Sequence, residues 1–243
     1  MVDSCDIVSW QDFTRKPATV WKLAKTVDVT LITPPILQDP VPDLPSPEWI
    51  IGSDPASVCR VMLYHEVLSS EESSAYFLAL QSGIHWQQRS IRLFGKQVMQ
   101  PRLIAWHGDP EAIYRYSGDT WYPEPWVPIL QALRQRCEHL CTSTFNSVLL
   151  NLYRDGNDAM GWHADDEPEL GHEPVIASLN LGCSRRFDLR HRHSGETHKV
   201  WLPAGSLLVM AGATQQHWRH QLPRSKKITQ PRLNLTFRRI ITC

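Results

Sequence analysis

The chain has no run of about 18 consecutive apolar residues, the length that a helix needs to cross a bilayer, so we predict no membrane partner. The N-terminal residues MVDSCDIVSW contain neither the basic start nor the apolar block of a secretory signal. Only six cysteines occur in 243 residues, and their spacing fits no disulfide framework. These absences predict a reduced, monomeric intracellular globular protein, cytoplasmic in a bacterium and nuclear and cytoplasmic in a eukaryote.

The formal net charge of the chain is zero, but its charged residues are unevenly distributed along the sequence. Between Cys183 and Ile240 there are twelve Lys and Arg residues, against only Asp188 and Glu196. A basic C-terminal third favours a surface that faces phosphates. The alternative, an ordinary solvated β-surface, stays equally open on charge alone.

Proline is concentrated near the N-terminus, with seven prolines in residues 34–55 and little periodicity around them. We therefore expect residues 1–57 to form a Pro-rich, partly irregular extension. Residues 58–243 are long enough to bury a core as one domain. Within this domain, residues 58–144 would supply helical support and a recognition hairpin, and residues 145–243 the β-rich core.

The first half of this domain contains helix signals. Ser69 and Glu72 form a capping-box pattern ahead of a helix that Gly83 would end. A second helix is predicted over residues 124–140, with proline at its start and two cysteines one turn apart on a buried face. Residues 60–68 are predicted as a strand, and residues 89–106 as a hairpin with its turn at 94–96.

The second half of the chain is typical of an all-β architecture. Short segments with β-type patterns are separated closely by Gly, Pro, Asn or Asp, which favours a sandwich or barrel. The predicted fold class is mainly β (α+β), with the two earlier helices supporting one sheet. The seven predicted strand segments are FNSVLLNLYRDG, EPVIASLNLG, RRFDLRHR, THKVWLP, GSLLVMAG, HWRHQLP and PRLNLTFRRI.

The stretch GWHADDEPELG suggests a metal site. In an extended strand, side chains at i and i+2 leave the same face, so His163 and Asp165 would point together. An imidazole and a carboxylate are two of the three ligands of the 2-His-1-carboxylate Fe(II) site. The third ligand must come from a distant strand, and ATQQHWRHQLP offers His217 and His220, between which spacing cannot choose. An exposed acidic loop and surface histidines are the alternative.

The C-terminal segment PRLNLTFRR predicts an anion site beside this metal. Leu233, Leu235 and Phe237 would share one face, and polar side chains the other. Guanidinium groups grip carboxylates bidentately, which lysine cannot match. A dicarboxylate such as 2-oxoglutarate would suit such a lining. The expected polar residues are Arg232, Asn234, Thr236 and Arg238, with Asn151 and Tyr153 on a second strand.

Together these motifs, with RLFGK, QPRLIAWHGD and YSG…PEPWVPIL, resemble the AlkB family of Fe(II)/2-oxoglutarate-dependent dioxygenases of the nucleic-acid-repair type. The resemblance extends from about residue 58 to residue 240. It implies a double-stranded β-helix (jelly-roll) core, the cofactor Fe(II), the co-substrates 2-oxoglutarate and O2, and oxidative demethylation of bases such as 1-methyladenine and 3-methylcytosine. DNA is the implied partner, with RNA as an alternative.

The resemblance also implies roles for individual residues. His163, Asp165 and His220 match the iron ligands, which selects His220 over His217. Arg232 matches the arginine on the distal carboxylate of 2-oxoglutarate, assisted by Tyr153. The remaining co-substrate positions are Asn151, Asn234 and Arg238.

Substrate contacts are also implied. Asp166 and Glu167 would favour a cationic base, and Trp106 and His107 would line the base pocket. Phe94 would act as a wedge in duplex DNA, although His107 and ATQQHWRH are closer to relatives that prefer single strands. The expected phosphate contacts are Arg102 and Arg185. Two alternatives remain: a protein or lipid substrate for the same chemistry, or a non-catalytic nucleic-acid-binding module.

Overall fold

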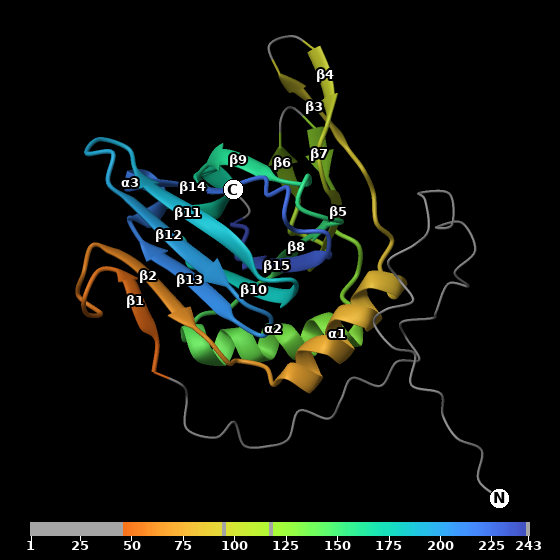
Figure 1. Cartoon of the computed structure of the whole chain (residues 1–243), viewed down its shortest axis with the longest axis horizontal. Helices are drawn as coiled ribbons and strands as arrows, with labels where there is room; N and C mark the ends of the chain where they lie inside the picture. The colour runs from red at the N-terminus through yellow and green to blue at the C-terminus, as the bar shows by residue number, and fades with distance from the viewer. Residues whose placement is uncertain (1–45, 94–95, 117–118, 242–243) are drawn as a thin grey trace, which may run out of the picture.

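The computed structural model describes residues 46–93, 96–116 and 119–241. Two antiparallel sheets face each other in it (Figure 1). The larger sheet has, in spatial order, β1 (Glu48–Ile51), β2 (Cys59–Tyr64), β13 (Leu207–Gly212), β10 (Ile176–Gly182), β15 (Arg232–Arg238), β8 (Ser147–Tyr153) and β5 (Leu103–Gly108). The smaller sheet has β12 (Thr197–Leu202), β11 (Arg185–His191), β14 (Trp218–Leu222) and β9 (Met160–His163).

The predicted fold class is confirmed. All seven segments predicted as strands are strands, and the two sheets form the jelly-roll core. Sequence neighbours are often separated in the sheets, as when β15, the last strand, lies between β8 and β10. This order brings side chains from distant parts of the chain onto one inner face.

Strict alternation along β15 divides the interior into two layers. Leu233, Leu235 and Phe237 are fully buried in a cluster shared with the helices. The side chains between them face the space between the two sheets, where a second apolar cluster surrounds a polar pocket. A shift of one residue would exchange these faces, so the pairing of β15 with β8 and β10 fixes the polar lining.

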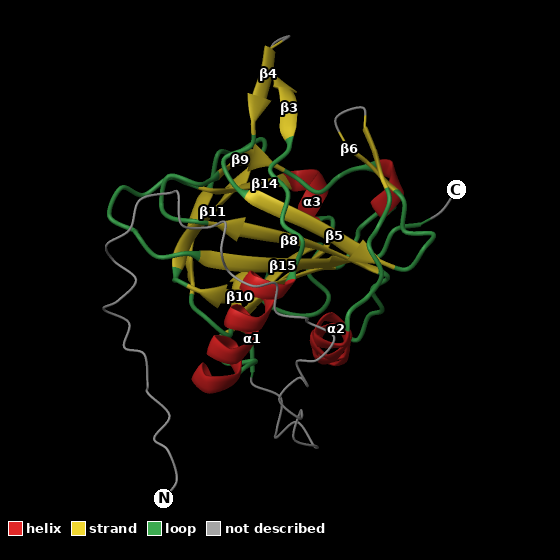
Figure 2. Cartoon of the chain, turned by 90° about the vertical axis from the view of Figure 1, so that its right-hand side faces the viewer, coloured by secondary structure: helices red, strands yellow, loops and turns green. Residues whose placement is uncertain are grey.

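Two helices cover the outer face of the larger sheet, as predicted (Figures 1 and 2). Helix α1 (Ser70–Gly83) begins with the predicted capping box between Ser69 and Glu72. Helix α2 (Pro128–Cys141) begins four residues later than predicted, because Glu124 instead forms backbone hydrogen bonds with β5. Both helices pack against β10.

A hairpin stands out of the body at the end opposite the helices (Figures 1 and 2). It consists of β3 (Ser90–Leu93) and β4 (Lys96–Met99), and its predicted turn at residues 94–95 lies outside the described residues. The hairpin is shorter than predicted, because Pro101 interrupts the pattern and residues 103–108 join the larger sheet through β8.

Several short elements were not predicted. β6 (Tyr114–Tyr116) and β7 (Asp119–Trp121) form a second hairpin, and α3 (Thr214–His217) is a single helical turn. Strand β1 comes from the predicted N-terminal extension and pairs with β2 at the sheet edge. Within the described part of the chain, no helix is long and apolar enough to cross a membrane.

Candidate active site

Three side chains with metal-binding atoms converge between the sheets. β9 and β14 pair so that His163 lies directly opposite His220, with ring centroids 4.2 Å apart. Asp165 follows just after the end of β9. The ligand atoms of these three residues all lie within 4.8 Å of one another. The convergence that the sequence predicted is therefore present in the structure, with His220 and not His217 as its third member.

Hydrogen bonds hold these side chains in place. His163 Nδ1 lies 2.8 Å from the carbonyl oxygen of Gly161, and donation to it leaves Nε2 with a free lone pair. The backbone N–H of Asp165 donates to Gln215 Oε1 at 3.0 Å. Arg238 Nη2 pairs with Asp165 Oδ1 at 2.8 Å, with both side chains buried. The arrangement is thus fixed by the protein itself.

The electrostatics of the three residues suit a cation. Burial lowers the pKa of His220 to about 3, with repulsion from His163 adding to the effect. Burial likewise lowers the pKa of His163, so both imidazoles are neutral near pH 7. For Asp165, burial would raise the pKa, but the positive charge of Arg238, which also donates to the carboxylate, outweighs burial and lowers it. Two neutral imidazoles and one carboxylate are the donor set of a facial Fe(II) site.

Arg232 lies in the same pocket and provides a buried positive charge. Its side chain is almost completely buried, and burial lowers its pKa to about 10, so it stays protonated near neutral pH. One amino group donates to the neutral amide of Asn180. Its Nε is buried and has no hydrogen-bond partner among the described residues. Because an uncompensated buried charge is costly, this guanidinium fits a carboxylate of a bound ligand.

The remaining residues expected around 2-oxoglutarate line this pocket too. The Tyr153 ring lies 5.3 Å from the Arg232 guanidinium carbon. Asn151 Oδ1 accepts a hydrogen bond from Arg102 Nε at 2.8 Å. Asn234 donates to Ser178 Oγ, and Thr236 donates to Asn234 Oδ1, so the polar face of β15 is internally connected. The pocket-lining polar residues include Asn151, Tyr153, Ser178, Arg232, Asn234, Thr236 and Arg238.

The similarity of this chain to known proteins is consistent with Fe(II) ligands at His163, Asp165 and His220. The family profile described as the 2OG-Fe(II) oxygenase superfamily matches residues 60–238. Alpha-ketoglutarate-dependent dioxygenase alkB homolog 3 of Mus musculus is 41% identical over 200 residues, covering 78% of this chain and 69% of the relative. The chain belongs to the AlkB family of these dioxygenases.

Two further comparisons extend this result. DNA oxidative demethylase ALKBH2 of Mus musculus is 37% identical over 210 residues, covering 82% of this chain and 87% of the relative. The solved structure of OsALKBH1 has a TM-score of 0.57 at 16% identity, covering 74% of this chain and 96% of that one, and shows the shared fold. Fe(II), 2-oxoglutarate and O2 are accordingly the cofactor and co-substrates of this dioxygenase family.

Only some of the residues expected to contact substrate line the pocket. Glu167 lines it, but Asp166 turns outward and forms an ion pair with Arg192 at 2.7 Å. The Asp166 carboxylate is thus half-exposed and paired with Arg192, and its expected role in favouring a cationic base stays a prediction.

Trp106 and His107 do not line the pocket among the described residues. Trp106 is buried, and its indole N–H donates to the carbonyl of Ala112 at 3.2 Å. His107 lies on the opposite face of β5, where its Nδ1 is 2.8 Å from the carbonyl oxygen of Pro125 and burial lowers its pKa. Trp106 shares the face of β5 that carries the pocket residue Ile104, whereas His107 lies on the opposite face. The role of both residues as walls of the base pocket stays a prediction.

The two arginines expected at phosphates are buried. Arg102 is 5% exposed and bonds to Asn151 inside the pocket wall. Arg185 is 1% exposed and donates to the backbone carbonyls of residues 155, 158 and 223. Neither reaches a surface where DNA could contact it, so both expectations are corrected. Phe94 lies outside the described residues.

Two residues of the site were not predicted from the sequence. Gln215, on α3, holds the backbone of Asp165, and only the fold brings this distant residue to it. Trp121, at the end of β7, lines the pocket, and the Arg89 guanidinium carbon lies 4.1 Å from its ring centroid. The aromatic-rich loop of residues 114–126 was the available signal for such a wall, but no periodicity identified the residue.

Proposed function

We propose that this dioxygenase removes methyl groups from N-methylated bases of nucleic acid, of the 1-methyladenine and 3-methylcytosine type. The observation that carries the proposal is a single cavity holding both the His163–Asp165–His220 group and the buried guanidinium of Arg232. The relatives named DNA oxidative demethylase ALKBH2 support DNA as the substrate, with RNA as the alternative.

Each part of the cavity has a task in this reaction. His163, Asp165 and His220 would hold Fe(II), which together with 2-oxoglutarate and O2 supplies hydroxylation of a methyl group, with succinate and CO2 released. Arg232 would bind the distal carboxylate, and Asn151 and Asn234 would orient the co-substrate. Arg238 holds the Asp165 carboxylate by its ion pair. A hydroxymethyl group on a base nitrogen then leaves as formaldehyde.

The substrate base must leave its stack to reach this cavity. Part of the cavity wall is apolar and aromatic, with Ile104 from β5, Leu149 from β8 and Trp121 from β7. The carboxylate of Glu167 lies in the same lining and favours a cationic base over a neutral one. The β3–β4 hairpin projects from the body of the protein (Figure 2), and none of its described residues lines the cavity. It would contact the polynucleotide on either side of the base that enters the cavity.

The experiment is an assay of purified protein with Fe(II), ascorbate, 2-oxoglutarate and an oligonucleotide carrying 3-methylcytosine. The base should lose the mass of one methylene group and formaldehyde should appear, both only when 2-oxoglutarate is present. Asp165→Ala should abolish turnover. Cys137→Ala, in the helix layer, should retain most of it.

Two outcomes would overturn the proposal. Succinate release with an unchanged base would place the substrate in another class, such as a protein or lipid. No succinate and no base change, in protein that binds Fe(II) and the oligonucleotide, would indicate a non-catalytic binding module. Parallel single-stranded and duplex oligonucleotides, in DNA and RNA, would establish the preferred substrate.

A further inference from the structure

A second group of three histidines lies outside the active-site pocket. His191 ends β11, His193 lies in the turn that follows, and His217 ends α3. Their ligand nitrogens all lie within 4.8 Å of one another. None of them lines the pocket that contains His163, and His217 is the histidine that spacing could not separate from His220.

The backbone brings these histidines together. The backbone N–H of Arg192, between the first two histidines, donates to the carbonyl oxygen of His217 at 2.8 Å. On the neighbouring strand, Trp218 lies opposite His191 in the β11–β14 pairing, and their rings are 5.1 Å apart. The convergence therefore follows from main-chain contacts that hold regardless of what the imidazoles bind.

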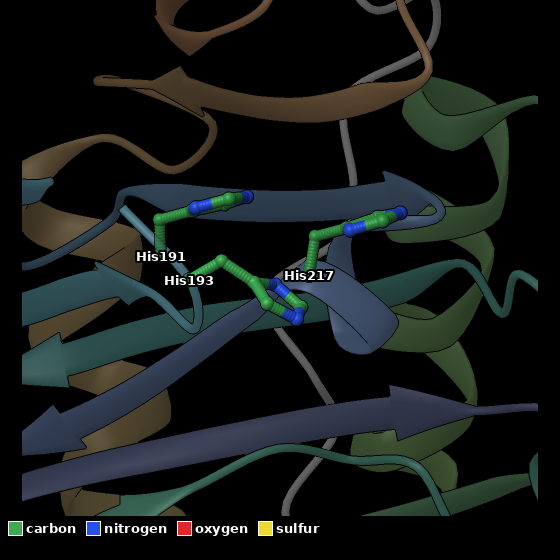
Figure 3. A group of neighbouring side chains, drawn as sticks. All are labelled: His191, His193 and His217. Atoms are coloured by element: carbon green, nitrogen blue, oxygen red, sulfur yellow. The ribbon is translucent and has the colours of Figure 1, made fainter. Parts of the chain in front are cut away.

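The three imidazole rings lie close together, with the His191 and His193 ring centroids 5.9 Å apart. The rings of His191 and His217 are nearly parallel, with an interplanar angle of 10° and centroids 6.1 Å apart. Figure 3 shows these two rings side by side with the His193 ring reaching toward them from the turn. The mutual distance of the three ligand nitrogens, within 4.8 Å, is what allows them to share one ion.

Ser194 holds the His191 ring in place. The backbone N–H of Ser194 donates to His191 Nδ1 at 3.1 Å, and Ser194 Oγ lies 2.9 Å from the same nitrogen. Such partners commonly orient histidines that bind metals. Three imidazoles, with no carboxylate or thiolate in the group, suit zinc and similar divalent transition metals and not Ca²⁺ or Mg²⁺, which require oxygen ligands.

We propose that His191, His193 and His217 form a second metal site, for a zinc-class divalent cation, separate from the iron site. A bound ion would join the turn after β11 to α3. Arg192 also donates to the carbonyl oxygen of Gln215, whose side chain holds Asp165, so the clamped segment adjoins the iron-ligand loop. This proposal concerns metal binding alone and does not depend on the substrate.

The test is a calorimetric titration of the full-length, tag-free, metal-stripped protein with Zn²⁺. Wild-type protein should bind two equivalents, one at each site. His193→Ala should bind one equivalent, because removing one of three ligands should lower the affinity by at least the roughly 10- to 100-fold that loss of a ligand's hydrogen-bond partner costs. His193 is exposed, so this change leaves the core intact. His172→Ala, at an exposed histidine outside both groups, should match wild type.

A second variant separates the two sites. His163→Ala with Asp165→Ala should still bind one equivalent, and this binding should be lost when His193→Ala is added. Co²⁺ as an absorbing probe should report the same pattern. The proposal is overturned if His193→Ala binds metal as His172→Ala does, or if the His163/Asp165 variant binds none.

Discussion

Arg232 shows how alternation along one strand places chemistry inside a fold. Its position opposite the apolar face of β15 follows from the sequence, and the structure confirms that Arg232, Asn234, Thr236 and Arg238 line the cavity. The ion pair of Arg238 with Asp165 could not be predicted, because it depends on how β9 and β15, on different sheets, face each other.

Arg232→Lys tests the role of the guanidinium. Lysine keeps the charge but cannot form the paired hydrogen bonds, and losing one charge-assisted bond costs about 1.5–3 kcal/mol. The KM for 2-oxoglutarate in steady-state succinate assays should therefore rise roughly tenfold to hundredfold. Arg239→Lys is the matched control, because Arg239 is exposed and lies just after the end of β15. An unchanged KM in Arg232→Lys would place the carboxylate elsewhere.

The buried histidines of the iron site predict a pH dependence. The pKa of His220 is about 3 in the folded protein, below its ordinary value, so the unfolded chain binds more protons between these values. The stability of the metal-free protein should therefore fall as pH drops below about 6.5, by up to ~1.4 kcal/mol per pH unit for each such histidine.

Urea denaturation of metal-free protein between pH 7.5 and pH 5 measures this slope. His220→Asn should flatten it, whereas His172→Asn, at an exposed position, should leave it unchanged. A metal-free protein that is as stable at pH 5 as at pH 7.5 would contradict the assignment of His220 as a buried neutral imidazole.

At the scale of elements, the sequence predicted long patterns better than short ones. Both helices were predicted from the signals at their ends, and the seven core strands from short segments separated by Gly, Pro, Asn or Asp. Strands β6 and β7 and the single turn α3 have only three or four residues each, too few for a period to appear. Gln215, on α3, was missed for this reason, although it holds Asp165.

Helix α1 provides the test at this scale. Its N-terminus is closed by the Ser69 hydroxyl, which accepts from the Glu72 N–H at 3.1 Å, and by the return bond from the Ser69 N–H to the Glu72 carboxylate. Ser69→Ala should lower the free energy of unfolding by about 1 kcal/mol. Ser74→Ala, at an exposed position inside the same helix, should change it little or increase it slightly.

Chemical denaturation of both variants measures this difference. Equal stabilities would mean that packing against β10, not the cap, determines where the helix begins. Demethylase activity should be unchanged in both variants, because α1 lies on the outer side of the larger sheet, away from the cavity.

At the scale of the whole molecule, the main apolar core and the polar site lie in different layers of the fold. The helices and the outer face of the larger sheet form one apolar cluster, and the space between the sheets holds the polar site. The sequence predicted these layers from alternation, but not the spatial order of the strands, because that order depends on pairings between residues far apart in the chain. The ion pair of Asp166 with Arg192 and the contact of His107 with the Pro125 carbonyl also depend on residues far apart in the chain.

Removing the projecting hairpin should weaken binding of the oligonucleotide without weakening binding of 2-oxoglutarate. Gln100 N donates to the Arg89 carbonyl oxygen at 2.8 Å, so the hairpin ends are adjacent and a short Gly-Ser turn can replace residues 90–99. The KM for the methylated oligonucleotide should rise by about tenfold or more. The affinity for 2-oxoglutarate, measured by calorimetry with Mn²⁺ present, should stay the same. Equal losses in both would mean that the hairpin supports the fold.

The most direct measurement is a crystal structure of the protein with Mn²⁺ and 2-oxoglutarate. We expect one ion bound by His163, Asp165 and His220, with the far carboxylate of 2-oxoglutarate on the Arg232 guanidinium. An ion found only among His191, His193 and His217, or a co-substrate that makes no contact with Arg232, would contradict it.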